Sequence, residues 1–216
     1  MRTWRLLPGE RSQLYSPIGL RLLDEMTGGP PIGRTEAFLD VQEGAVWRST
    51  EIQAVRTAGG VIAYPGLERR ADVTGPPRHY RVRIAAELYR PLYLITHEGI
   101  ELDAFPWNDT NPPAKTAHEP REVKLAPAPN YPFPAHVPVL RGMVVDGGQV
   151  SVANAEVMYV NLERVLSDER GEFALPLRFA PLNVPVTIDA LRGGLQGSIN
   201  VTLPAALGKS QTISIS

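Results

Sequence analysis

In the stretch Tyr80-Arg-Val-Arg-Ile-Ala-Ala-Glu-Leu88, apolar side chains stand at every second position, and the positions between them are polar except for Ala85. Because neighbouring side chains of a β-strand point to opposite faces, this period of two predicts a half-buried strand. The same alternation returns at residues 198–203 and 212–216. The chain also holds 21 prolines and 19 glycines, which interrupt any long helix. The sequence therefore predicts an all-β protein made of short strands.

The middle of the chain is rich in proline, and the stretch Ala126-Pro-Ala-Pro-Asn-Tyr-Pro-Phe-Pro134 is its densest part. Proline lacks a backbone donor, so we expect this stretch to run extended and stiff, without regular ladder bonds. We interpret it as a semi-rigid linker whose Tyr131 and Phe133 pack on a neighbouring module. The alternative is a proline-rich ligand for a recognition domain.

The linker divides the 216 residues into two modules of a size that can each bury a modest core. We expect an N-terminal arm over residues 1–16, a first module over 17–125, the linker over 126–138 and a second module over 139–216.

Three pairs of short segments are similar in the two modules and occur in the same order, which favours an internal duplication. The pairs are Ile18-Gly-Leu-Arg-Leu-Leu-Asp24 with Leu140-Arg-Gly-Met-Val-Val-Asp146, Gly60-Val-Ile-Ala-Tyr-Pro65 with Gly171-Glu-Phe-Ala-Leu-Pro176, and Tyr80-Arg-Val-Arg-Ile84 with Val184-Pro-Val-Thr-Ile188.

The second module also carries Gly142-Met-Val-Val-Asp146, Ala155-Glu-Val157 and the hairpin Ser167-Asp-Glu-Arg-Gly-Glu-Phe173. In these residues it resembles the carboxypeptidase regulatory-like family, whose members have a transthyretin-like fold. The first module lacks the hairpin, and we interpret it as a divergent relative. The resemblance implies two tandem antiparallel β-sandwich modules, and it implies an accessory role, because such modules stiffen, space or bind and rarely catalyse.

Composition narrows the classes of function. The chain has no cysteine, and its first residues hold no apolar run typical of a signal peptide, so we expect a cytoplasmic protein. A formal net charge of −1 argues against binding to nucleic acid or to an anionic membrane. The four histidines are widely spaced, and no nucleophile elbow or phosphate loop occurs. We therefore expect no catalytic residue, no cofactor and no metal.

Our first hypothesis is a non-catalytic structural subunit that binds other protein subunits. Tandem cysteine-free sandwiches are similar in style to small structural proteins of phage tails and contractile injection particles. Four apolar residues of the arm are candidates for contact with a neighbouring subunit: Trp4, Leu6, Leu7 and Leu14. The alternative is that the arm folds back on its own module.

The second hypothesis is an accessory module that binds a carbohydrate or peptide. Trp47 and Trp107 each stand beside polar loop residues and are candidates for stacking on a sugar. Asp103 and Asp109 near Trp107 admit a calcium interpretation, although scattered loop carboxylates are usually only solvated. The sequence leaves the oligomeric state open.

Overall fold

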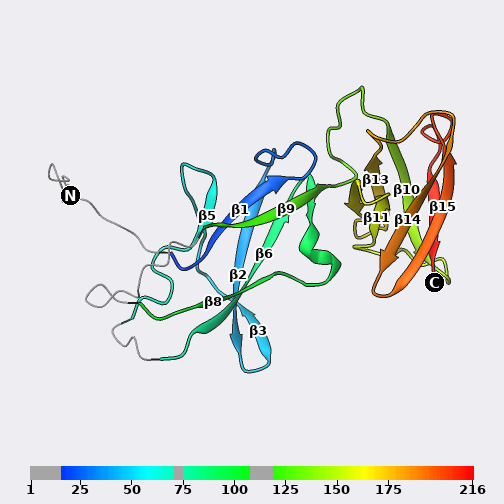
Figure 1. Cartoon of the computed structure of the whole chain (residues 1–216). Helices are drawn as coiled ribbons and strands as arrows, with labels where there is room; N and C mark the ends of the chain where they lie inside the picture. Colours follow the sequence, from blue (N-terminus) through cyan, green and yellow to red (C-terminus); the bar gives the residue numbers. More distant parts are fainter. Residues whose placement is uncertain (1–15, 71–74, 108–118) are drawn as a thin grey trace.

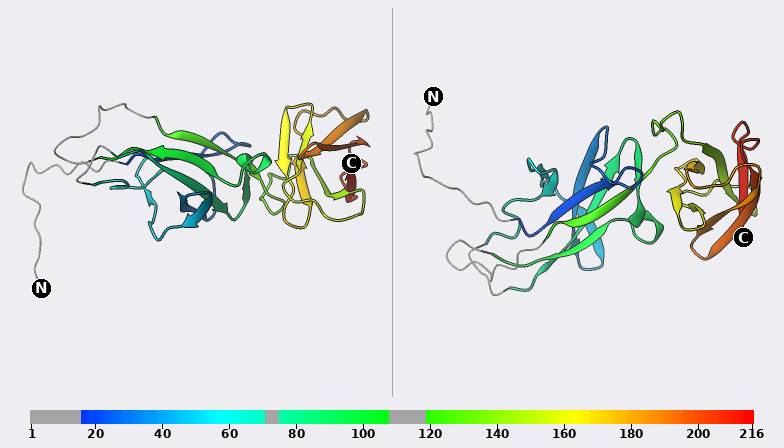
Figure 2. Two further views of the ribbon diagram at one scale, coloured as in Figure 1. Left: turned by 90° about the horizontal axis from the view of Figure 1, so that it is seen from below. Right: turned by 45° about the horizontal axis from the view of Figure 1, so that its top comes forward.

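The computed structural model describes residues 16–70, 75–107 and 119–216. These residues form two β-rich bodies that follow one another along the chain (Figure 1). Each body has its own hydrophobic core, one between Ile18 and Tyr131 and the other between Leu140 and Ile215. The two further views in Figure 2 show the bodies end to end. The all-β prediction is confirmed.

The first module packs two sheets against each other. One sheet has the strand order β3-β2-β6-β8, and the other has the order β4-β5-β1-β9-β7. The strands are β1 (Gly19–Asp24), β2 (Thr35–Glu43), β3 (Val46–Ser49), β4 (Val55–Arg56), β5 (Val61–Ala63), β6 (Arg78–Ala86), β7 (Tyr89–Pro91), β8 (Ile100–Ala104) and β9 (Arg121–Pro127). A single 3-10 turn, η1 (Leu92–Ile95), follows β7.

The second module has the same two-sheet arrangement with fewer strands. Its sheets have the orders β12-β11-β14-β15 and β13-β10-β16. The strands are β10 (Val139–Asp146), β11 (Glu156–Tyr159), β12 (Glu163–Leu166), β13 (Glu172–Pro176), β14 (Pro185–Arg192), β15 (Leu195–Thr202) and β16 (Gln211–Ile215).

The strand register supports the internal duplication indicated by the three pairs of similar segments, which we call echoes. Leu20 lies opposite Ile62 in the first module, and the residues that the echoes align with them, Gly142 and Phe173, lie opposite each other in the second. In both modules the first strand also pairs in parallel with the last, β1 with β9 and β10 with β16. Each module therefore adds one parallel pair to otherwise antiparallel sheets, which local alternation does not reveal.

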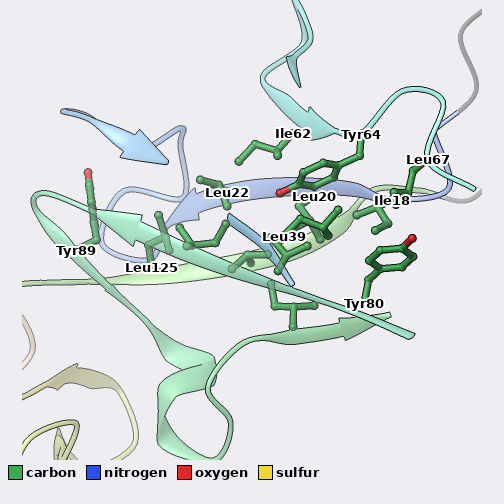
Figure 3. Close-up of a cluster of buried hydrophobic side chains, with 14 of the residues drawn as sticks. Ile18, Leu20, Leu22, Leu39, Ile62, Tyr64, Leu67, Tyr80, Tyr89 and Leu125 are labelled. Carbon is green, nitrogen blue, oxygen red and sulfur yellow. The ribbon is translucent and has the colours of Figure 1, made fainter. Parts of the chain in front are cut away.

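Alternation explains which side chains form the first core. Leu20 and Leu22 point inward from β1, and Leu39 from β2 faces them across the sandwich (Figure 3). Tyr80 closes the core at the start of β6, and it is almost fully buried. The polar residues between these positions face solvent or make ion pairs, as the period of two requires.

The hairpin Ser167–Phe173 owes its shape to two residues. The Asp168 carboxylate accepts hydrogen bonds from the backbone N–H groups of Arg170 and Glu172, both at 2.9 Å. Gly171 has φ +77°, and a Cβ there would lie 2.6 Å from the Val144 carbonyl oxygen. Only glycine fits this turn without strain.

The expected linker begins too early at residue 126. Strand β9 continues to Pro127, and Tyr89 and Arg90 lie opposite Pro127 and Ala126. A proline at the last position of a strand still offers its carbonyl group, so the ladder reaches it. The N–H of Ala128 then donates to the Leu88 carbonyl at 3.0 Å. The first part of the expected linker therefore belongs to the first module.

Candidate interaction sites at the module junction and on the first sheet

A buried carboxylate ties the proline-rich stretch to the first module. Tyr131 donates its hydroxyl to Asp24 Oδ2 at 2.9 Å, and Tyr89 donates to the same oxygen at 3.3 Å. Asp24 is 1% exposed and Tyr131 is 6% exposed. Phe133 packs edge-on against the Tyr131 ring, with centroids 4.9 Å apart. These contacts place Tyr131 and Phe133 on the first module, and burial raises the pKa of the Tyr131 hydroxyl.

On one side of the junction between the two modules, an arginine of each module donates hydrogen bonds to the other module. Arg90 on β7 donates to Glu169 and to the Asn154 side chain in the second module. Arg192, at the end of β14, donates to the Leu94 and Ile95 carbonyls of η1 at 2.8 and 3.1 Å. The Arg90 guanidinium lowers the pKa of Glu169, which keeps this carboxylate charged. A cleft of about 840 Å³ lies beside these contacts.

A second set of contacts crosses the junction near Glu25. Arg164 on β12 donates through two nitrogens to Glu25 Oε1 at 2.9 and 3.2 Å. Arg178 donates to the Met26 carbonyl at 2.9 Å, and the buried Glu163 holds the same guanidinium at 2.8 Å. The Glu25 carboxylate raises the pKa of Arg164 by hydrogen bonding.

The junction is therefore fixed by four guanidinium groups rather than by the linker alone: Arg90, Arg164, Arg178 and Arg192. Each guanidinium is planar and presents several donors at once, so each contact restrains direction as well as distance. A bend of one module on the other would break bonds in at least one set. The arrangement can hold two sandwiches at a set angle.

A network of charged and aromatic side chains lies on the outer face of β3-β2-β6. Asp40 is 2% exposed, and it accepts from Arg83 at 2.7 and 2.9 Å and from Arg81 at 3.0 and 3.1 Å. These hydrogen bonds, Arg83's first, hold the pKa of Asp40 below its ordinary value. Arg81 lies over the Trp47 ring at 5.0 Å, and Arg83 lies 5.8 Å from the Phe38 ring centre.

The two tryptophans proposed for stacking on a sugar do not share a site. Trp47 is on β3 and Trp107 follows β8, and these strands are the opposite edges of one sheet. Each ring already has an arginine over it, Arg81 for Trp47 and Arg69 for Trp107. Carbohydrate binding stays a prediction.

The other candidates are placed as follows. Trp4, Leu6, Leu7 and Leu14 lie outside the described residues, as do Asp109 and His118. The Asp103 carboxylate contacts the His79 ring. The described residues contain no group of three or more acidic or histidine side chains able to hold a metal ion. No helix in the described part is long and apolar enough to span a membrane.

Sequence reasoning missed the junction arginines. Their partners are distant in the chain, since Arg164 binds Glu25 and Arg192 binds carbonyls of η1. The available signal was the strong preference for arginine over lysine, which suits planar contacts at interfaces. It does not say which arginines take part.

The chain matches no family model and no curated protein. Among solved structures, the Bacillus anthracis TIE protein aligns over 94% of this chain and 33% of its own, at 11% identity and a TM-score of 0.30. A streptococcal ancillary pilin aligns over 92% and 62%, at 12% identity and a TM-score of 0.27. A C-terminal fragment of the pilus adhesin SpaC from Lactobacillus rhamnosus GG aligns over 94% and 95%, at 13% identity and 0.20.

The chain thus spans about a third of the first of these structures and 62% of the second. TM-scores this low assign neither a function nor a partner to this chain.

Proposed function

We propose that this chain is a non-catalytic structural subunit, made in the cytoplasm, that serves as a stiff two-module spacer within a larger protein assembly. The observation that carries the proposal is the junction: Arg90, Arg164, Arg178 and Arg192 bridge the modules from both sides. Domains joined by a polar interface usually move relative to each other. A set of directional contacts that opposes this motion therefore favours a mechanical role.

The second module is proposed to be a member of the carboxypeptidase regulatory-like family. The local structure of its motif residues supports this proposal. Asp146 ends β10 and accepts bonds from the N–H groups of Gly148 and Val150 in the turn that follows. The hairpin Ser167–Phe173 joins β12 to β13. Members of that family mostly act as accessory modules, which agrees with a spacer.

The class of assembly is proposed by analogy with phage tails and contractile injection particles, whose small structural proteins have the same style. The test is to purify the protein from its native host and follow it by sedimentation. We expect it to travel with a large particle containing tube, sheath or baseplate proteins. A free monomer throughout the gradient would overturn the assembly role.

Stiffness is tested separately, because a spacer could be stiff and belong to another assembly. The chain has no cysteine, so one cysteine added to each module accepts a spin label at a known place. We expect a single narrow distance distribution between the labels. The double variant Arg90→Ala, Arg192→Ala should broaden it, whereas Arg48→Ala, Arg56→Ala, which removes two exposed arginines on β3 and β4 that make none of the contacts across the junction, should not. An equally broad distribution in the unmodified protein would refute stiffness.

A further inference from the structure

The two modules differ at one edge of the sheet that contains β2. In the second module, Val157 and Met158 of β11 lie opposite Ala190 and Asp189 of β14, and on their other side they pair with Val165 and Arg164 of β12. Strand β11 is therefore covered on both edges.

The equivalent residues of the first module are covered on one edge only. Thr35 and Glu36 of β2 lie opposite Ala86 and Ala85 of β6, the positions that the echoes align with Ala190 and Asp189. Strand β3 pairs with β2 only from Asp40 to Glu43, and its register goes no further. Within the described residues, no strand pairs with Thr35 or Glu36 on the β3 side.

The backbone groups along this edge point outward in a regular way. The N–H of Thr50 donates to the Leu39 carbonyl at 2.9 Å, so Leu39 presents its backbone groups toward the β3 side. In an antiparallel strand this direction alternates, so Ala37 and Thr35 present theirs to the same side. Such an edge accepts an added strand.

A groove runs along this edge, where the second module has β12. It has a volume of about 770 Å³ and is bordered by β2, by residues 50–54 and by Ile62 of β5. Its apolar lining includes Phe38 and Ile52, which are 42% and 44% exposed, and the small side chains Ala37 and Ala54. Two exposed carboxylates, Glu36 and Glu51, border it together with Arg56.

The geometry points to one occupant: the segment Thr3–Leu7 of the same chain, added as a strand beside Thr35–Phe38, next to the Leu39 carbonyl that Thr50 already binds. Thr3-Trp4-Arg5-Leu6 alternates polar and apolar side chains, as a half-buried strand requires, and Pro8 would end it. In this pairing Trp4 and Leu6 face the small residues of the groove, while Arg5 faces the carboxylates. Glu36 also pairs with Arg34 at 2.5 Å, so the match rests on the apolar side chains more than on charge.

The chain can reach the groove. Ser16 accepts a hydrogen bond from the Tyr64 backbone N–H at 2.9 Å, and Tyr64 stands just beyond β5. Ile62, two residues back along β5, lines the groove. The residues between Leu7 and Ser16 can span about 30 Å when extended, which is ample for this path. A short tether also gives a high effective concentration, which favours the chain's own segment over a second copy.

This inference does not depend on the proposed assembly role. It assigns Trp4 and Leu6 to the first module rather than to a neighbouring subunit, so the arm would complete a sheet.

Engineered disulfides test the assignment, since the chain has no cysteine of its own. The pair Arg5→Cys with Glu36→Cys, and the pair Arg5→Cys with Glu51→Cys, replace charged side chains, and since Glu36 and Glu51 are exposed we expect the fold to stay intact. Under mild oxidation at low micromolar concentration we expect an intrachain disulfide in at least one pair, seen as a monomer of altered mobility on a non-reducing gel. The matched control is Arg5→Cys with Glu101→Cys, because Glu101 is exposed on β8 at the opposite edge of the same sheet.

Two outcomes would overturn the proposal. Cross-linking no greater than in the Glu101 control would show that the segment does not occupy the groove. Disulfide-linked dimers in place of the intrachain product would show that it occupies the groove of a second copy.

Hydrogen exchange gives an independent readout. Deleting residues 1–7 should raise the exchange rates of the Thr35 and Ala37 amides at least tenfold. The exchange rate of the Val157 amide, on the equivalent edge of the second module that β12 covers, should stay unchanged. Equal rates at Thr35 and Ala37 with and without the segment would contradict the pairing.

Discussion

Replacing Tyr131 with phenylalanine removes one hydroxyl from a buried site and leaves the ring in place. That hydroxyl donates to Asp24 Oδ2 at 2.9 Å. A hydrogen bond to a charged group contributes about 1.5–3 kcal/mol to stability. Asp24 keeps the Tyr89 hydroxyl at 3.3 Å and the Met26 N–H at 2.8 Å, so the carboxylate is not left without partners. We therefore expect the low end of this range, about 1.5 kcal/mol.

The assay uses the uneven distribution of tryptophan. Trp4, Trp47 and Trp107 all precede the proline-rich stretch, so tryptophan fluorescence reports unfolding of the first module alone. A loss of 1.5 kcal/mol should lower the urea midpoint of this transition by about 0.5–1.5 M.

The matched control is Tyr159→Phe, a half-buried tyrosine on β11 of the second module. It should leave the fluorescence transition unchanged. A loss below about 0.5 kcal/mol in Tyr131→Phe, which is the range of an ordinary surface substitution, would refute the view that this stretch is anchored through Asp24.

Two further perturbations test one module each. A Cβ at Gly142 would lie 2.2 Å from the Gln211 carbonyl oxygen, so Gly142→Ala should destabilise the second module by at least about 3 kcal/mol in circular dichroism melts, whereas Gly147→Ala, with nothing within 4 Å, should have little effect. Hydrogen bonds from Arg83 lower the pKa of Asp40 from its ordinary 3.8, so this carboxylate stabilises the first module above about pH 4 and the contribution is lost as the pH falls below that value. Fluorescence-detected stability should therefore fall as the pH drops below about 4, and Asp40→Asn should flatten that fall; an unchanged slope would contradict the assignment.

Local sequence patterns predicted the strands and turns that adjacent residues determine. The alternation at Tyr80–Leu88 marks β6, and the first two echoes align residues that face one another in both modules. The turn at Gly171 follows from Asp168 and from the space that only glycine leaves. In each case a few adjacent residues decide the structure.

Contacts between residues that are distant in the chain could not be predicted from the sequence. The parallel pairing of β1 with β9 joins segments about a hundred residues apart in the chain, and nothing in either strand specifies its neighbour. The same holds for Arg164 and Glu25 across the junction. The sequence makes Trp47 a candidate for stacking on a sugar, but the position of Arg81 over that ring depends on how β6 lies beside β2 and β3.

The junction depends on a part of the first module that its sister lacks. In the second module, β14 and β15 are joined by the tight turn Gly193-Gly194, and both glycines have positive φ. In the first module, the equivalent connection from β6 to β8 contains β7 and η1. Arg90 stands on β7, and the carbonyls that receive Arg192 belong to η1. Since a two-residue turn suffices to connect these strands, the inserted elements are not needed to form the sandwich. They pack on the first module through the pairing of β7 with β9, and they also carry the groups that contact the second module, which is why we assign them to holding the two modules together.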